Sequence, residues 1–427
     1  MRTARPALLF GAVKMLKKLG VSTKQILVPY YWLPYNFGRG YALPPISVNM
    51  EFTFRCNLRC QMCSLVVSNA VVTGGYPLNR GEAGDDLEAI RGKELESPDY
   101  LKLLDDLRDF GVRRVNFTGG EPLIKKGAPD ILRRATRNGF HVSMISNGTV
   151  MTDDVCDALM GVDSLTVSVD GPEAIHNEIR GSDTGFQRIR QNVGKLQEWK
   201  KKTGSERPAI QFSCAVSAMN QTHVSQVVDF ARELGVRSVN YGYLFFNDED
   251  ATKDTEQYAL TGQADFCDQR IPMHLRQVNL DLMKKELREA RRKAGEMGIQ
   301  LSFNPPLEED ELEDRFNSPL YFYTNKCFVP WYETRVNPFG DVYSCQIDTL
   351  LGNIREKPFR KIWNAQPYRE FRALIREHKL LSKCSRCCKL NDRMWNSLPR
   401  IGFFPKRFTA PSRPLGSSRR LPVLPAS

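Results

Sequence analysis

Residues 46–63 read ISVNMEFTFRCNLRCQMC, a β-rich run followed closely by three cysteines. The first eight residues of this stretch are typical of a β-strand. Cys56, Cys60 and Cys63 then lie within eight positions of one another, a spacing that suits thiolate ligands of one metal centre. We therefore predict a strand with a metal-binding loop after it.

Strand-like and helix-like segments alternate beyond this stretch. Helical periodicity fills the gaps between the predicted strands, and several helices end at a glycine that suits a C-cap. Such βα repeats imply a parallel sheet with helices outside and a site at the carboxyl ends of the strands. The prediction is an α/β fold, a partial (β/α)6 barrel over residues 46–305. The six strands are predicted at 46–53, 113–118, 141–146, 164–169, 209–216 and 238–245.

The rest of the chain divides by composition into four segments. Residues 1–45 are basic and read as a short amphipathic helix that packs on the body, with contact to anionic lipid as the alternative. The acidic residues 306–319 are predicted to be a linker, and residues 320–396 a small cysteine-bearing domain. The tail at 397–427, rich in Pro, Arg and Ser, is predicted to be disordered.

Charge and hydropathy exclude several classes of protein. The net charge is +12, but residues 1–40 carry seven basic side chains and 397–427 carry six, with no acidic residue in either segment. The body between them holds 48 basic and 49 acidic residues, which disfavours a nucleic-acid groove. No apolar run is long enough to cross a bilayer, and the eleven cysteines lie mostly in tight groups. We expect a cytoplasmic protein in a reducing compartment, with peripheral membrane contact through its basic ends left open.

Three clustered thiols differ from the four that close a tetrahedral metal site. In an iron–sulfur cube each of four irons needs one ligand besides its sulfides, so three cysteines leave one iron open to a substrate or cofactor. Two alternatives remain at this point. One is a zinc site completed by a distant residue, and the other is a set of structural thiols.

The pattern Cys56-x3-Cys60-x2-Cys63 after the first strand resembles the signature of radical S-adenosylmethionine (SAM) enzymes. This resemblance implies that a [4Fe-4S] cluster binds SAM through its open iron. The position before the third cysteine is often aromatic in that family and packs near the adenine. Here it is Met62, whose thioether can still make a sulfur–aromatic contact.

Three further motifs follow in the order that the resemblance leads one to expect. TGGEP at 118–122, SNGT at 146–149 and SVDGPEAIHNEIRG at 168–181 each follow or end a predicted strand. The first implies a carboxylate for the SAM amino group, and the others imply ribose and SAM carboxylate contacts. The cofactor-binding residues predicted in this way, with Met62, are Gly119, Gly120, Glu121, Ser146, Asn147, Ser168, Asp170 and Arg180.

A second cysteine group lies near the C-terminus and resembles the auxiliary-cluster extension called SPASM, or its shorter form, twitch. Thiolate spacing by itself fits either zinc or a fully ligated cluster. The segment has five cysteines where a full SPASM extension has seven or more, so we predict one auxiliary [4Fe-4S] cluster, with Cys388 as an alternative fourth ligand. The predicted ligands are Cys327, Cys345, Cys384 and Cys387.

The chemistry implied by the resemblance is reductive cleavage of SAM to a 5′-deoxyadenosyl radical that abstracts a hydrogen atom from a substrate. Oxidation or crosslinking would follow, with the auxiliary cluster as electron acceptor or relay and a flavodoxin or ferredoxin as reductant. The predicted substrate is a small molecule or a peptide, with a peptide-modifying maturase or a modifier of lipids as alternatives. A non-catalytic electron-transfer protein is the alternative from another class.

Overall fold

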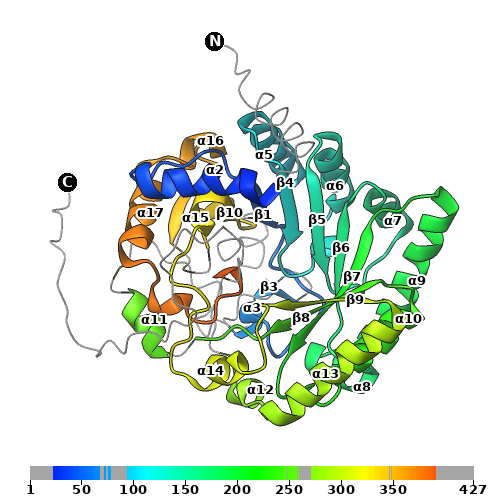
Figure 1. Cartoon of the computed structure of the whole chain (residues 1–427). Coiled ribbons are helices and arrows are strands. Elements are labelled where there is room, and N and C mark those ends of the chain that lie inside the picture. Colours follow the sequence, from blue (N-terminus) through cyan, green and yellow to red (C-terminus); the bar gives the residue numbers. More distant parts are fainter. Residues whose placement is uncertain are drawn as a thin grey trace.

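The computed structural model shows one curved sheet with helices around its outer side (Figure 1). The two ends of the chain and several internal segments are not among the described residues. The predicted amphipathic pattern before residue 23 and the predicted disordered tail therefore fall outside the described residues. The structure describes residues 23–67, 72–73, 76–77, 94–247, 249–256, 258, 271–345, 347 and 349–390.

Ten strands form the main sheet in the order β12-β11-β10-β1-β4-β5-β6-β7-β8-β9. All neighbours from β10 to β9 are parallel, and β10, β11 and β12 are antiparallel. A two-stranded ribbon, β2 (Val72–Thr73) with β3 (Tyr76–Pro77), lies apart from it. The main strands are β1 (Ser47–Glu51), β4 (Arg114–Thr118), β5 (His141–Ser146), β6 (Ser164–Ser168), β7 (Ala209–Val216), β8 (Ser238–Tyr243), β9 (Gln300–Asn304), β10 (Glu333–Val336), β11 (Asp341–Tyr343) and β12 (Leu350–Asn353).

The six predicted barrel strands are therefore confirmed as β1 and β4 to β8, and β9 and β10 extend the parallel sheet at its two sides. Alternate residues of β1, β4, β6 and β8 are buried, and those between them are partly exposed. The two faces of a strand see different surroundings because successive side chains point to opposite sides. The buried face packs under the helices, and the partly exposed face lines the concave side of the sheet.

The outer helices supply the apolar cover. In α5, for example, Tyr100, Leu103, Leu104 and Leu107 are buried, and each such side chain contributes about 1.5–3 kcal/mol through burial. α5 ends at Gly111, whose φ of 104° is the left-handed conformation of a glycine C-cap. The helices outside the barrel strands are α5 (Ser97–Phe110), α6 (Ala128–Arg137), α7 (Asp153–Leu159), α8 (Glu173–Arg180), α9 (Gly185–Thr203), α10 (Gln226–Glu233) and α13 (Leu280–Met297).

The C-terminal segment joins the barrel through the sheet. β10 pairs with β1 in parallel, from Ser47 opposite Glu333 to Met50 opposite Val336. The cysteine-bearing segment thus continues the barrel's own sheet and lies beside α2 (Figure 1). Its helices are α15 (Val329–Tyr332), α16 (Phe359–Ile362) and α17 (Gln366–His378), followed by the 3-10 turns η2 (Ser382–Cys384) and η3 (Cys388–Leu390).

The acidic stretch predicted to be a linker is folded over half of its length. α14 (Glu311–Asn317) forms there, and Arg315 is fully buried within it. Arg315 donates to the main-chain oxygens of Tyr243, Leu244 and Arg386. The sequence pattern missed this helix because its single buried cation is satisfied only by carbonyl groups from distant segments.

The remaining described helices are short or peripheral: α2 (Thr23–Phe37), α3 (Ser64–Val67), α11 (Glu249–Glu256), α12 (Met273–Arg276) and the 3-10 turn η1 (Pro122–Ile124). Among the described residues, no helix combines the length and the apolar character that a bilayer span needs.

Candidate functional site

The cysteine triplet lies in the loop after β1, at the carboxyl ends of the strands. The main chain of this loop is fixed by the end of α8. Arg59 N donates to Arg180 O at 3.2 Å, and Gln61 N donates to Ile179 O at 2.9 Å. These bonds bring a segment more than a hundred residues away against the cysteines, so the end of α8 sets the position of the loop.

Donor groups from three segments face the thiols. Arg180 Nη1 lies 3.7 Å from Cys60 Sγ, and Asn147 Nδ2 lies 3.9 Å from Cys56 Sγ. Burial lowers the pKa of Arg59 while the charges of the three cysteines act in the opposite direction, and its Nε and Nη2 have no hydrogen-bond partner among the described residues. Two cationic side chains and one amide therefore surround the sulfur atoms.

Arg180 owes its orientation to Asp170. Its Nε donates to Asp170 Oδ2 at 2.5 Å, and Asp170 is fully buried. The other carboxylate oxygen accepts from Ala215 N at 2.9 Å. Burial lowers the pKa of Arg180, but the charges of Asp170 and Cys60 outweigh burial and raise it, so the guanidinium stays charged. Because protein donors occupy both oxygens of Asp170, this carboxylate acts on the site through Arg180.

The thiols and their surroundings fit an iron–sulfur cluster by their chemistry. Burial raises the pKa of Cys56 to about 12 and also raises that of Cys60, so thiolates at these positions need a compensating positive centre. The cations and the amide described above are suited to an anionic thiolate-bound cluster, whose sulfurs accept hydrogen bonds. Within the described residues, no three His, Cys, Asp or Glu side chains converge on a single metal ion.

The TGGEP turn packs directly on the triplet loop. Gly120 N donates to Thr53 O at 2.7 Å, and Glu121 N donates to Arg55 O at 2.8 Å. A Cβ on Gly119 would lie 2.4 Å from Thr53 O, and one on Gly120 would lie 2.2 Å from Arg55 O. The two glycines are therefore required for close approach of β4's end to the main chain before Cys56.

The carboxylate of Glu121 is fully buried between two strand ends. It accepts from Ser146 Oγ at 2.9 Å, Asn147 N at 2.7 Å and Leu123 N at 3.1 Å. Burial raises the pKa of Glu121 to about 6, although these three hydrogen bonds act in the opposite direction. A cation beside this carboxylate would compensate for the solvation that the carboxylate loses on burial. A buried carboxylate of this kind is suited to bind an ammonium group.

The SNGT turn links the Glu121 carboxylate to the triplet loop. Asn147 Nδ2 donates to Asn57 Oδ1 at 2.8 Å, and Asn57 Nδ2 donates to Thr149 Oγ1 at 2.8 Å. Asn147 thus contacts Glu121 through its main chain and the cysteine loop through its side chain. Asn57, which lies between two of the cysteines, was absent from the sequence-predicted residues.

The last two predicted cofactor contacts lie in different surroundings. Ser168 ends β6 on the partly exposed face and pairs with Ser213 of β7. Met62 is partly buried and packs against the apolar cluster of Leu244, Phe246, Ile271 and Leu275. The structure therefore places Ser168 beside the concave face and Met62 against an apolar wall.

The second cysteine group is assembled from three separate segments. Cys327 precedes α15, Cys345 follows β11, and Cys384 ends η2. Burial raises the pKa of Cys327 well above its ordinary value, and the charges of Cys384 and Cys345 act in the same direction. Cys387 is partly exposed, its main-chain N donates to Cys384 O at 3.2 Å, and a hydrogen bond from Cys387 lowers the pKa of Cys388.

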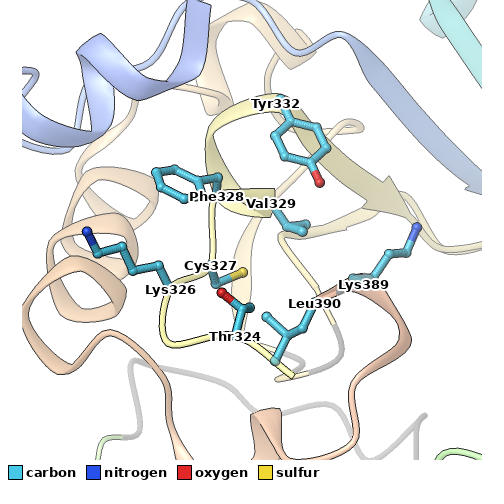
Figure 2. A pocket seen from close by; sticks show the side chains of 8 residues that line it. All are labelled: Thr324, Lys326, Cys327, Phe328, Val329, Tyr332, Lys389 and Leu390. Carbon is cyan, nitrogen blue, oxygen red and sulfur yellow. The ribbon is translucent and has the colours of Figure 1, made fainter. Parts of the chain in front are cut away.

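A small pocket opens beside this group, lined by Cys327, Thr324, Tyr332 and Lys389 among others (Figure 2). Figure 2 shows the Cys327 sulfur and the Lys389 side chain at its wall. Lys389 Nζ lies 2.5 Å from Glu333 Oε1, which also accepts from Asn49 Nδ2 at 2.9 Å. The turn that follows Cys387 is therefore tied to β10 and β1.

From Asn49 a row of polar side chains continues across the concave face. Asn116 Nδ2 donates to Asn49 Oδ1 at 3.1 Å, and Ser143 Oγ donates to Asn116 Oδ1 at 3.0 Å. Arg335 and Glu51 form an ion pair of 3.4 Å on the same side of the sheet. The concave face is thus polar and partly exposed along β1, β4 and β5.

Sequence reasoning also missed an anchor before the triplet. Glu94 is buried and accepts from Thr53 Oγ1 at 2.8 Å and from Phe54 N at 3.1 Å. Arg55 Nε lies 3.5 Å and Lys125 Nζ lies 3.6 Å from Glu94 Oε2. Nothing in the spacing of the sequence marks Glu94, because its partners are distant along the chain.

Comparison with known proteins agrees with this geometry. Residues 50–205 match the model of the radical SAM superfamily, and residues 327–388 match that of SPASM, an iron–sulfur cluster-binding domain. The AdoMet-dependent heme synthase of Methanosarcina barkeri is 26% identical over 363 residues, which are 80% of this chain and 88% of that protein.

Two further relatives are named for reactions other than heme synthesis. The PqqA peptide cyclase of Xanthomonas euvesicatoria is 24% identical over 76% of this chain and 75% of its own length. The tungsten-containing aldehyde ferredoxin oxidoreductase cofactor-modifying protein of Pyrococcus furiosus is 22% identical over 79% and 86%.

A solved structure shares the fold. Streptococcus suis SuiB bound to S-adenosylmethionine superimposes with a TM-score of 0.52 at 14% identity, over 87% of this chain and 79% of that one. The fold class predicted from the sequence, with a parallel partial barrel and a C-terminal SPASM domain, is therefore confirmed. The radical SAM domain implies a [4Fe-4S] cluster and SAM, and the SPASM domain implies auxiliary iron–sulfur clusters. The chain is therefore a radical SAM enzyme with a C-terminal SPASM domain.

Proposed function

We propose that Cys56, Cys60 and Cys63 bind the [4Fe-4S] cluster and that the SAM bound there acts on a substrate held against the concave face of the sheet. When bound, the cluster and SAM supply a 5′-deoxyadenosyl radical that takes a hydrogen atom from the substrate, with the electron coming from a reduced flavodoxin or ferredoxin. The observation that carries the proposal is that Arg180 faces Cys60 and Asn147 faces Cys56 at the carboxyl edge of the barrel, where the three thiols lie in one loop.

The chain's own residues orient the cofactor in this proposal. Glu121 is the acceptor for the SAM ammonium, since it is a buried carboxylate to which the described residues supply no cation. Asn147 and Ser146 keep that carboxylate in place through their hydrogen bonds. Arg180, oriented by Asp170, faces the cluster at Cys60, which supports a role in tuning the cluster besides a SAM carboxylate contact.

The remaining predicted contacts have supporting roles. Gly119 and Gly120 allow the close approach on which the Glu121 position depends. Met62 supplies an apolar wall for the adenine, and Ser168 a hydroxyl at the edge of the concave face.

The auxiliary cluster is bound by Cys327, Cys345, Cys384 and Cys387 in this proposal, with Cys388 as the alternative fourth ligand. Four protein thiolates occupy every iron, so this cluster's use is to accept or relay an electron. Oxidation or crosslinking of the substrate follows from that use. Among substrates we favour a peptide, because the relatives include PqqA peptide cyclases.

The test is anaerobic reconstitution with iron and sulfide, followed by reduction in the presence of SAM. We expect 5′-deoxyadenosine, and iron at about eight per chain. Binding of iron and sulfide without the formation of 5′-deoxyadenosine would contradict the enzymatic proposal. Candidate peptides labelled with deuterium would then show the substrate by transfer of the label into 5′-deoxyadenosine.

A further inference from the structure

An exposed apolar surface covers α2 and the turn after it. Nine large apolar side chains of the described residues are exposed, and five of them lie between residues 32 and 43. We name these five the α2 patch. They are Trp32 (38% exposed), Leu33 (50%), Phe37 (71%), Tyr41 (51%) and Leu43 (45%). Single exposed apolar residues are ordinary, but such a concentration marks an interaction surface.

The opposite side of α2 is already used for packing. Tyr31 and Tyr35 are buried, with the Tyr35 ring 4.5 Å from Phe328 and 4.8 Å from Trp331. Tyr31 lies 5.2 Å from Tyr332. Since the inner side of the helix is fixed on α15, the outward position of the α2 patch is set by the fold.

Cationic side chains accompany the patch. Arg39 is exposed within it, and Arg369 of α17 donates to Tyr41 Oη at 3.0 Å and lies 4.8 Å from that ring. α17 also carries an exposed Arg376, together with the exposed acids Glu370 and Glu377. Upstream of α2, residues 1–22 add five basic residues and no acidic one by sequence.

We propose that the α2 patch docks on the surface of a bilayer that contains anionic lipid. Trp and Tyr favour the boundary between headgroups and acyl chains, and Phe and Leu contribute burial of apolar area. Each basic residue near an anionic surface contributes further attraction, and no acidic residue within the first forty opposes it. This charge complementarity selects an anionic membrane over an apolar protein partner. The proposal is independent of the chemistry proposed above.

The experiment is flotation of the full-length protein, loaded with its clusters, on vesicles of phosphatidylcholine alone and on vesicles that also contain phosphatidylglycerol. We expect binding to the second kind, weakened by high salt. The double variant Trp32→Ser/Phe37→Ser should bind about tenfold more weakly, because two large side chains leave the interface. The matched control, Met273→Ser/Leu282→Ser, removes two apolar side chains that are exposed elsewhere and should bind as the wild type does.

A conservative variant supplies a second readout. Trp32→Phe should keep the vesicle binding and lose most of the blue shift of tryptophan emission that vesicles cause in the wild type, because Trp32 is the one exposed tryptophan among the described residues. Wild-type protein that stays free of both vesicles, or a double variant that binds as well as the control, would overturn the proposal. So would a dimer that dissociates in the double variant without any vesicle binding, since the patch would then face a second copy. Formation of 5′-deoxyadenosine should be the same in the double variant, so failure of this proposal and of the proposed function are separate results.

Discussion

The two cysteine groups differ in how the protein surrounds them. The first lies in one short loop, where Cys56 and Cys63 are partly exposed and donors from α8 and β5's end face the sulfurs. The second draws its thiols from three segments around α15, β11 and η2; Cys327 and Cys384 are buried there, as Cys60 is in the first group, and Cys345 and Cys387 are partly exposed. Three thiolates leave one iron of a cube without a protein ligand, whereas four thiolates occupy every iron. We therefore expect chemistry at the first group and electron transfer at the second.

The largest effect is expected from Cys60→Ala. Removing a ligand of the first cluster should abolish 5′-deoxyadenosine formation and lower the iron content by about four per chain. The measurements are chromatography of the SAM products and an iron assay. Cys156→Ala is the matched control, since Cys156 is buried in α7 outside both groups. If Cys60→Ala still cleaves SAM, the first cysteine group is not the one on which SAM cleavage depends.

Cys384→Ala should remove the second cluster and leave the first one intact. The variant should lose about four irons per chain and still cleave SAM when reduced, because the first group is unchanged. Product formation from a substrate should be lost. If the substrate product forms at the wild-type rate, the electron-transfer role of the second group is wrong.

Arg180→Gln should change the electronic properties of the first cluster without removing a ligand. The guanidinium stabilises the more negative, reduced cluster, so its loss should lower the reduction potential by an amount on the order of 50 mV. A redox titration followed by electron paramagnetic resonance measures this shift. Arg288→Gln, an exposed change on α13, is the control. The auxiliary potential should stay constant in both variants, and an equal shift at both clusters would contradict a local effect.

The smallest effect concerns Glu121, a group without a counterpart among the described residues of the second site. Burial raises its pKa from 4.5 to about 6, so its contribution to stability is complete below about pH 4.5 and is lost as the pH rises through 6. Without SAM, the free energy of unfolding of the wild type relative to Glu121→Gln should fall by about 2 kcal/mol across this range. Chemical denaturation at several pH values measures it. If the difference in unfolding free energy between the two proteins does not vary with pH, the pKa of Glu121 is not raised in the folded protein and the prediction is wrong.

Much of the site was predictable because its residues lie in local patterns. The three thiols after β1 and the turns after β4 and β5 end neighbouring parallel strands, and strand ends of a parallel sheet meet at one edge. Glu121, Asn147 and Cys56 are brought together there as the order of the motifs predicted. The roles of the individual residues remain predictions until the variants above are measured.

The sequence by itself determined the alternation of strands and helices and the positions of the thiols, because those depend on side-chain periodicity and on spacing within a few residues. Only the tertiary structure decided that β10 continues the barrel sheet beside β1, that α14 stands where a linker was predicted, and that Glu94 anchors the loop before Cys56. It also decided that Asp170 orients Arg180 and that, among the described residues, one side of α2 is exposed. The physical reason is common to all of them: buried charges and apolar surfaces are satisfied by partners distant in the chain, and no local pattern records which partner is near.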